Sequence, residues 1–366
     1  MPSTGQTLES RSRATGEVKE PTMDNKEARV EGIRKLEGAL EARIIAYMMA
    51  DRPPFAAQVG GDVIRLFQRH LQKIGRVSRI GLVLYTRGGD VLTPLRLVRL
   101  IREHCEKFDV VIPYRAHSAG TLIALGADRI LMGEMGELAP IDPRVASPFN
   151  PEDESVRGPE AGKKPRVQIS VEDMRAYLAL AREGGDLSTP EGRCEAFMEL
   201  ARKVHPLALG SVHRSHMLIR LIAKLLLSMH MHDSQDNEKQ AIQHIVETLT
   251  EKLYAHDFLI SRTDAEQYVG LKVEKPSQEV ESDLWALFEL YEVALELEKQ
   301  GGAAEMLGSE QDKAFDVASA LIDSAEMTHV YVVKGRLQRA AKGAETGINV
   351  RIDSQGWRVV GDQQVG

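Results

Sequence analysis

Three short apolar runs in the first half of the chain each end in small residues. Residues 80–85 lead into a Gly-Gly pair, residues 110–114 lead into a Ser-Ala-Gly turn, and residues 129–132 lead into a glycine. Between the first two runs, residues 92–104 carry apolar side chains at helical spacing, with Pro94 at the first helical position. Buried strands that alternate with helices are typical of βαβ units in a parallel sheet covered on both faces. The pattern therefore predicts an α/β fold.

The rest of the chain extends this predicted sheet on both sides. The periodicity predicts helices at 27–41, 62–74, 211–229, 238–254, 275–300 and 312–325. Strands are predicted at 43–49 and, as a small antiparallel sheet, at 328–333, 347–352 and 357–360. Helices thus dominate the second half, and the chain ends in a small β-rich tail.

The same pattern divides the chain into three parts. Residues 1–25 are polar and predicted to be disordered. Residues 26–274 form the predicted α/β domain, in which 147–165 is rich in proline, glycine and charge and is expected to be a mobile loop. Residues 275–366 form a helical and β-rich extension, to which the sequence assigns no role.

Composition narrows the choice of function. At 366 residues with 43% hydrophobic content, the chain can bury one substantial core. A net charge of −7 and a pI near 5.9 argue against a general nucleic-acid binder. The two cysteines indicate a reducing compartment rather than a disulfide framework. The first twenty residues lack the apolar core of a secretory leader. Charged residues interrupt the most apolar predicted helix, so it is not expected to span a membrane. We therefore expect a cytoplasmic protein without a membrane span.

Candidate chemistry lies at the carboxyl ends of the predicted strands, where α/β proteins bind their ligands. Ser118 follows a strand and begins a helix made of small and apolar residues. The backbone N–H groups of the Gly88-Gly89 turn and of Ala119 are candidates to hold a developing oxyanion, and one such donor typically contributes roughly 3 kcal/mol in the transition state. A plain helix cap at Ser118 and a plain turn at Gly88-Gly89 explain the spacing equally well.

Three motifs together resemble a known family. TRGGD, then HSAGT about thirty residues later, then GELAPIDPR, is similar to the Clp-fold serine proteases. The similarity extends from about residue 35 to residue 273 and points to the SDH-type (serine dehydrogenase proteinase) branch, related to signal peptide peptidase A and to the Clp protease subunit. The resemblance implies a ClpP/crotonase-like fold, a peptide or protein substrate, no cofactor, and a closed homo-oligomer.

The resemblance also suggests which residues activate Ser118. In the Clp protease subunit, a histidine follows the serine by about 25 residues and an acid comes later. This chain has Asp142 at the first position and His256 near the second. Exchanging the partners makes His256 the base and Asp142 the carboxylate that orients it, which triad chemistry permits. Without the resemblance, Asp142 is better explained as a turn former and His256 as a polar contact at a helix end.

Other mechanisms and functions stay open. A Ser–Lys dyad, as in signal peptide peptidase A, requires a desolvated lysine, and the candidates Lys163, Lys164 and Lys252 all lack an apolar setting in the sequence. A catalytically inactive Clp-fold scaffold that binds peptides or partner proteins is the second function class. A relative of the enoyl-CoA hydratases would share the oxyanion pocket, but it has no use for a serine at this turn.

Several further cofactors and partners are not supported. The chain has no GxxxxGK[ST] loop, so an unfolding ATPase would have to be a separate partner. It has no GxGxxG motif for a dinucleotide. His230, His232 and Asp233 lie close together in sequence, but no further ligand completes a metal set, so no metal site is predicted.

Overall fold

The structure is a computed structural model of the whole chain. It describes residues 25–361 except for 142–143, 146, 153–165, 168, 185–188, 232–235, 254, 256, 300 and 341–346. Most of the predicted mobile loop at 147–165 and nearly all of the predicted disordered segment at 1–25 therefore lie outside the described residues.

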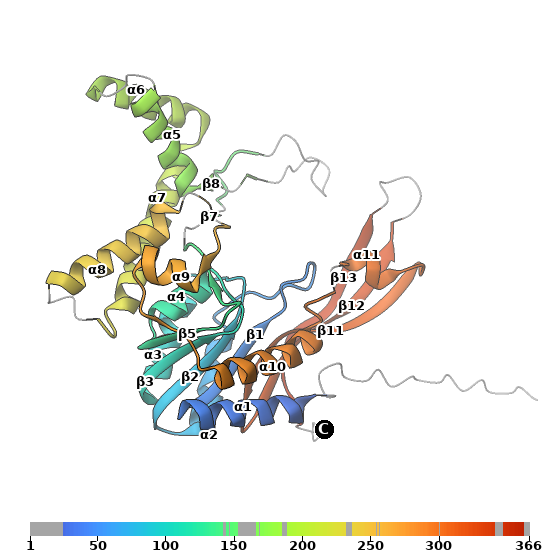
Figure 1. Cartoon of the computed structure of the whole chain (residues 1–366). Helices are drawn as coiled ribbons and strands as arrows, with labels where there is room; N and C mark the ends of the chain where they lie inside the picture. The colour runs from blue at the N-terminus through green and yellow to red at the C-terminus, as the bar shows by residue number, and fades with distance from the viewer. Residues whose placement is uncertain are drawn as a thin grey trace, which may run out of the picture.

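An eight-stranded sheet forms the centre of the molecule, in the order β10-β5-β3-β2-β1-β11-β12-β13 (Figure 1). Its parallel strands are β1 (Arg43–Met49), β2 (Val77–Tyr85), β3 (Cys105–Ile112), β5 (Arg129–Met132) and β10 (Val273–Glu274). Its antiparallel strands are β11 (Asp312–Ser324), β12 (Thr328–Arg339) and β13 (Ile348–Val359). The predicted α/β fold, with a mostly parallel central sheet and a β-rich C-terminal region, is confirmed.

Helices cover both faces of the parallel strands. The side chains of α2 (Val63–Ile74), α3 (Thr93–Arg102) and α4 (Ala119–Leu125) pack into one apolar cluster with one face of the sheet. α1 (Lys26–Leu40) and α10 (Gln278–Leu295) cover the other face in a second cluster. The parallel strands are consequently buried on both sides, which explains their continuous apolar runs.

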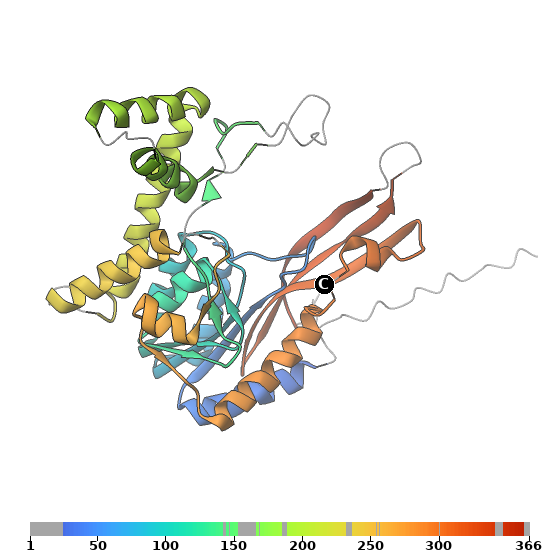
Figure 2. The ribbon, with the colours of Figure 1, turned by 45° about the horizontal axis from the view of Figure 1, so that its top comes forward.

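A helical arm projects from the edge of this core (Figures 1 and 2). It consists of α5 (Val171–Gly184), α6 (Pro190–Lys203), α7 (Pro206–Leu227) and α8 (Asp236–Glu247), followed by a π-helical turn at Thr248–Lys252. α7 starts at Pro206 and continues through Gly210, so it begins five residues before the predicted helix at 211–229. Among the described helices, none combines the length and apolar character that crossing a membrane requires.

Short elements complete the chain. A three-stranded sheet contains β4 (Arg115–Ala116), β6 (Glu137–Leu138) and β9 (Ile260–Ser261), and a two-stranded one contains β7 (Arg144–Val145) and β8 (Ile169–Ser170). The remaining short helices are α9 (Arg262–Asp264), the π-helical turn Ala265–Val269 and α11 (Ala303–Leu307). The β4-β6-β9 sheet matters most, because it carries the chain into Ser118.

One predicted helix is wrong. Residues 312–325 form the strand β11, which pairs antiparallel with β1 over Ile45–Met49 and continues the central sheet. From Val317 to Ser324 every residue is buried, so the alternation typical of a half-exposed strand is absent. The helix-forming alanines and leucine in this stretch suggested the wrong period.

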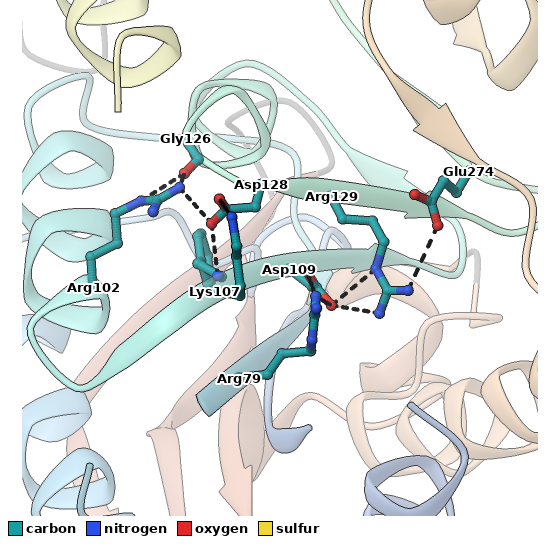
Figure 3. A network of polar contacts seen from close by, with 9 residues as sticks. Arg79, Arg102, Lys107, Asp109, Gly126, Asp128, Arg129 and Glu274 are labelled. Atoms are coloured by element: carbon teal, nitrogen blue, oxygen red, sulfur yellow. Dashed lines mark hydrogen bonds and ion pairs between the residues drawn. The ribbon is translucent and has the colours of Figure 1, made fainter. Parts of the chain in front are cut away.

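An ion-pair network joins the parallel strands away from their carboxyl ends (Figure 3). The Asp109 carboxylate in β3 is almost fully buried and accepts hydrogen bonds from Arg79 in β2 at 2.8 Å and from Arg129 in β5 at 2.6 Å. Next to it, Asp128 pairs with Arg102 at 2.9 Å and with Lys107 at 3.1 Å. These contacts hold three neighbouring strands together and leave the opposite edge open for chemistry.

Candidate active site

Ser118 lies on a sharp turn between β4 and α4. Its backbone has φ 51° and ψ −106°, a conformation that an L-residue rarely adopts and that costs on the order of 1–3 kcal/mol. The residue is half-buried, and its side chain makes no capping hydrogen bond to α4. The plain helix-cap explanation is therefore not supported, and the geometry is similar to the strained strand-to-helix turn that presents the nucleophilic hydroxyl in α/β-hydrolases.

Gly88 lies directly against this serine. A Cβ atom built on Gly88 would be 2.8 Å from Ser118 Cβ and 3.3 Å from Ser118 Oγ, and the residue has φ 115°. Only glycine fits this close approach without displacing the serine. The Gly88 N–H donates to Thr86 Oγ1 at 3.0 Å, so this amide already has an acceptor.

The Gly89 and Ala119 amides differ from that of Gly88, because neither has an acceptor among the described residues. The extended residue Val59 bonds to the other groups of the turn, donating to Gly88 O and accepting from Asp90 N, both at 2.8 Å. Within the described part of the chain, neither the Gly89 N–H nor the Ala119 N–H has an acceptor. Of the three predicted oxyanion-hole positions, Gly88 thus has its N–H bonded and its Cα packed against Ser118, while the Gly89 and Ala119 N–H groups have no acceptor in the described part of the chain.

His256 and Asp142, the predicted base and orienting acid, both lie outside the described residues. Their described neighbours contact the π-helical turn Thr248–Lys252 and the β4-β6-β9 sheet. Ile141 donates its N–H to Leu249 O at 3.0 Å, and β9 pairs with β6, which pairs with β4. The exposed Asp257 lies close enough to His117 to act on its pKa. The assignment of both roles remains a prediction.

Of the three candidate lysines for a Ser–Lys dyad, the structure describes only Lys252. Lys163 and Lys164 are outside the described residues. Lys252 has a 43% exposed side chain and pairs with Glu247 at 3.1 Å. A catalytic lysine needs desolvation and no such partner, so the surroundings of Lys252 do not suit that role.

The sequence missed a polar cluster beside the serine. The Asp51 carboxylate, just after β1, accepts hydrogen bonds from Tyr85 OH and Arg87 Nε, both at 2.9 Å, and from Arg115 at 3.3 Å. Arg115 also donates to Glu137 at 2.8 Å. Asp51, Tyr85, Arg87 and Arg115 lie at or just beyond strands that meet at the carboxyl edge of the sheets. α/β proteins bind their ligands at this edge, so the position of these residues relative to the predicted strands was the available signal.

His117 lies at the edge of this cluster. Its Nε2 lies 3.5 Å from Glu137 Oε1 and has no hydrogen-bond partner among the described residues. Burial, followed by the nearby Arg87 and Arg115 guanidinium groups, lowers the pKa of His117 to about 4. The imidazole is therefore neutral at pH 7 and faces β6, as expected for the residue before Ser118.

A metal set was not predicted, and the described residues do not form one. Among them no group of three or more histidine, cysteine or carboxylate side chains is arranged to hold an ion. His230 Nε2 lies 3.0 Å from Leu125 O, while His232 and Asp233 are outside the described residues.

The fold is a mostly parallel α/β fold, and Ser118 lies on the strained turn between β4 and α4. Residues 21–151 match the family model of the ClpP-like SDH-type serine proteinases. The match contains Gly88, Gly89, Ser118 and Asp142 but ends before His256. It confirms the resemblance over this segment and indicates the serine-protease class.

Similar proteins are found in an archaeon and among solved structures. Two uncharacterized proteins of Methanocaldococcus jannaschii are 25% identical over 228 residues and 39% identical over 66 residues. These alignments cover 62% and 18% of this chain, and 63% and 23% of the two relatives, so the chain spans less than two thirds of either.

Two structures of the 1510-N membrane-bound stomatin-specific protease also match. One is a serine-to-alanine variant with 15% identity and a TM-score of 0.34, covering 69% of this chain and 86% of that one. The other is a lysine-to-alanine variant with a substrate peptide, with 16% identity, a TM-score of 0.32 and coverage of 64% and 76%.

Proposed function

We propose that the chain is a serine peptidase that cleaves peptide bonds through an acyl-enzyme on Ser118. One observation carries the proposal. A half-buried serine on a strained strand-to-helix turn lies against Gly88, and the adjoining Gly89 and Ala119 amides have no acceptor among the described residues. Two such amides match the donors that a tetrahedral oxyanion requires.

The proposed reaction has two steps, acylation of Ser118 and hydrolysis of the acyl-enzyme. Ser118 Oγ attacks the carbonyl carbon of the scissile peptide while a base takes its proton, and the oxyanion is held by the Gly89 and Ala119 amides. The C–N bond then breaks, and the base gives the proton to the leaving amine. Water, deprotonated by the same base, hydrolyses the ester and regenerates Ser118. Gly88 keeps the serine and the amides close together.

We assign the base to His256 and its orientation to Asp142. The support is the chain path around them: Ile141 is bonded to Leu249, and β9, four residues after His256, lies in the sheet that leads into Ser118. His256→Ala and Asp142→Ala should both abolish hydrolysis while the thermal unfolding temperature stays near that of the wild type. Lys252→Ala is the matched control and should keep activity. Near-full activity in both of the first two variants would contradict the assignment.

Partners and location follow from the family resemblance as proposals. We propose a homo-oligomer in the cytoplasm that accepts unfolded or peptide substrates. A folded substrate would require an unfolding ATPase on a separate chain. The scaffold alternative gains no specific support from the site.

Labelling with a fluorophosphonate probe tests the proposal. The wild type should be labelled, Ser118→Ala should not, and Ser309→Ala, which changes an exposed serine outside the site, should be labelled normally. Peptide hydrolysis should fall by on the order of 10⁶ in Ser118→Ala. Absence of label and turnover in a folded wild type would leave the scaffold as the better assignment.

A further inference from the structure

A cavity of about 270 Å³ lies beside the loop that follows β1. Residues 54–58 form one wall, and β11, β12 and β13 form the other. Val59, the next residue of the loop, is hydrogen-bonded to Gly88 and Asp90. The cavity therefore adjoins the segment that supports the Gly88-Gly89 turn, but none of the proposed catalytic residues lines it.

Two polar residues, Ser319 and Asp62, line the cavity. Ser319 is 2% exposed, and its Oγ has no hydrogen-bond partner in the described structure. A buried hydroxyl without a partner is costly, so it indicates a missing ligand group or water. Asp62 precedes α2 without capping it by its side chain. One of its oxygens accepts a hydrogen bond from Trp357 Nε1 at 2.7 Å.

Charge and aromatic surface favour a cation. Among the described residues that line the cavity, Asp62 is the only acidic one and none is basic. Tyr331 and Trp357 form a wall with their rings 5.4 Å apart at 72°. The third aromatic ring, Phe55, already has the Arg52 guanidinium above it at 5.4 Å. A carboxylate beside tyrosine and tryptophan rings is the combination that binds ammonium and guanidinium groups.

We propose that this cavity binds the lysine or arginine side chain of a peptide. The cationic head lies at Asp62 and against the Trp357 ring, and Ser319 Oγ accepts a hydrogen bond from it. The volume is at the small end of ligand sites, which suits one side chain rather than a whole small molecule. The binding site does not depend on the proposed peptidase activity, because it shares no residue with it.

Binding is best measured with full-length Ser118→Ala protein, in which the peptides cannot be consumed through that residue. The probes are acetyl-Gly-Lys-Gly-amide and acetyl-Gly-Gln-Gly-amide, titrated by calorimetry and by the fluorescence of the two tryptophans. We expect the lysine peptide to bind about tenfold tighter, a difference of about 1.4 kcal/mol. Because Asp62 is exposed, this preference should shrink as salt is added.

Variants locate the site. Asp62→Asn, which can still accept the Trp357 hydrogen bond, should remove the preference and leave the glutamine peptide unchanged. Trp357→Phe should remove the fluorescence change on binding. Ser319→Ala should lower the affinity for the lysine peptide about threefold. Asp312→Asn, an exposed aspartate on β11 that does not line the cavity, is the control and should behave like the parent. Equal binding of both peptides, a preference that survives Asp62→Asn, or no saturation at millimolar peptide would each overturn the proposal.

Discussion

Replacing Gly88 by alanine tests how closely the turn supports the serine. The new Cβ would lie 2.8 Å from Ser118 Cβ and 3.2 Å from His117 O, whereas ordinary contacts begin at 3.4 Å. The serine or the turn must therefore move by about half an ångström. The positive φ adds backbone strain of about 1–3 kcal/mol to the folded state.

Gly88→Ala should affect the catalytic rate and the stability by different amounts. A 1 Å misplacement can lower a rate about 10²-fold, so a shift of half an ångström should lower kcat/KM roughly tenfold. If the turn moves instead, the Gly89 amide is lost as well, and the loss approaches about 10²–10³. Stability should fall by the strain alone, which urea denaturation measures.

Gly75→Ala is the matched control for Gly88→Ala. Gly75 also has a positive φ, 79°, but a Cβ there would meet nothing within 4 Å, and it ends α2 away from the serine. This variant should lose similar stability and keep the wild-type rate of fluorophosphonate labelling. If Gly88→Ala is also labelled at the wild-type rate, Gly88 does not position the nucleophile and the geometric argument is wrong.

Three further predictions concern the surroundings of the site. Thr86→Val removes the acceptor of the buried Gly88 N–H and should lower the free energy of unfolding by about 1–3 kcal/mol and slow labelling. Asp109→Asn leaves two arginines without their shared carboxylate and should lower stability by up to about 3–5 kcal/mol, with labelling of the folded protein unchanged. Burial, and then His329, lowers the pKa of His70 from 6.5 to about 3. Between these values the unfolded chain binds a proton that the native chain does not, so stability falls as the pH drops, by up to about 1.4 kcal/mol per pH unit. His70→Gln should show a correspondingly shallower slope in urea denaturation between about pH 4.5 and 6.5.

Each of these has an outcome that counts against it. An unchanged unfolding energy in Thr86→Val would show that water satisfies the Gly88 amide. A fall in labelling of folded Asp109→Asn would mean that the network in Figure 3 acts on the site after all. Parallel pH slopes for wild type and His70→Gln would show that His70 does not titrate as argued.

The parallel part of the fold was predictable because its signals are local. Residues 129–132 form β5 as expected, and Pro94 lies in the first turn of α3. The α2 periodicity also matches its buried face, which includes Phe67 and Leu71. When a strand is buried on both sides and ends in small residues, both of its ends can be recognised in the local sequence.

The C-terminal strands were harder because their partners are distant. β11 is made a strand by its pairing with β1, more than 260 residues earlier, and its own residues favour a helix. The two short strands predicted at 347–352 and 357–360 form one strand, β13, with a bulge opposite Lys334 and Gly335. Long-range pairing overrides local preference in both places.

The site was predictable only where one short segment defines it. The turn at Ser118 and the glycines at 88 and 89 could be found from their spacing. The strand-end rule marks Asp51 only as one candidate among several, because its contacts with Tyr85, Arg87 and Arg115 depend on three strand ends that meet only in the folded sheet. The cavity that we propose for a lysine or arginine side chain is likewise lined by residues about 260–300 positions apart, such as Asp62 and Trp357.

The most direct measurement is the location of the covalent intermediate. A slowly hydrolysed peptide ester or an activated ester is mixed with the protein, the reaction is quenched with acid, and the acylated peptide is sequenced by mass spectrometry. We predict that the acyl group is found on Ser118 and that Ser118→Ala forms none. An acyl group on another residue, with Ser118 unmodified in the active protein, would contradict the assignment of this serine as the nucleophile.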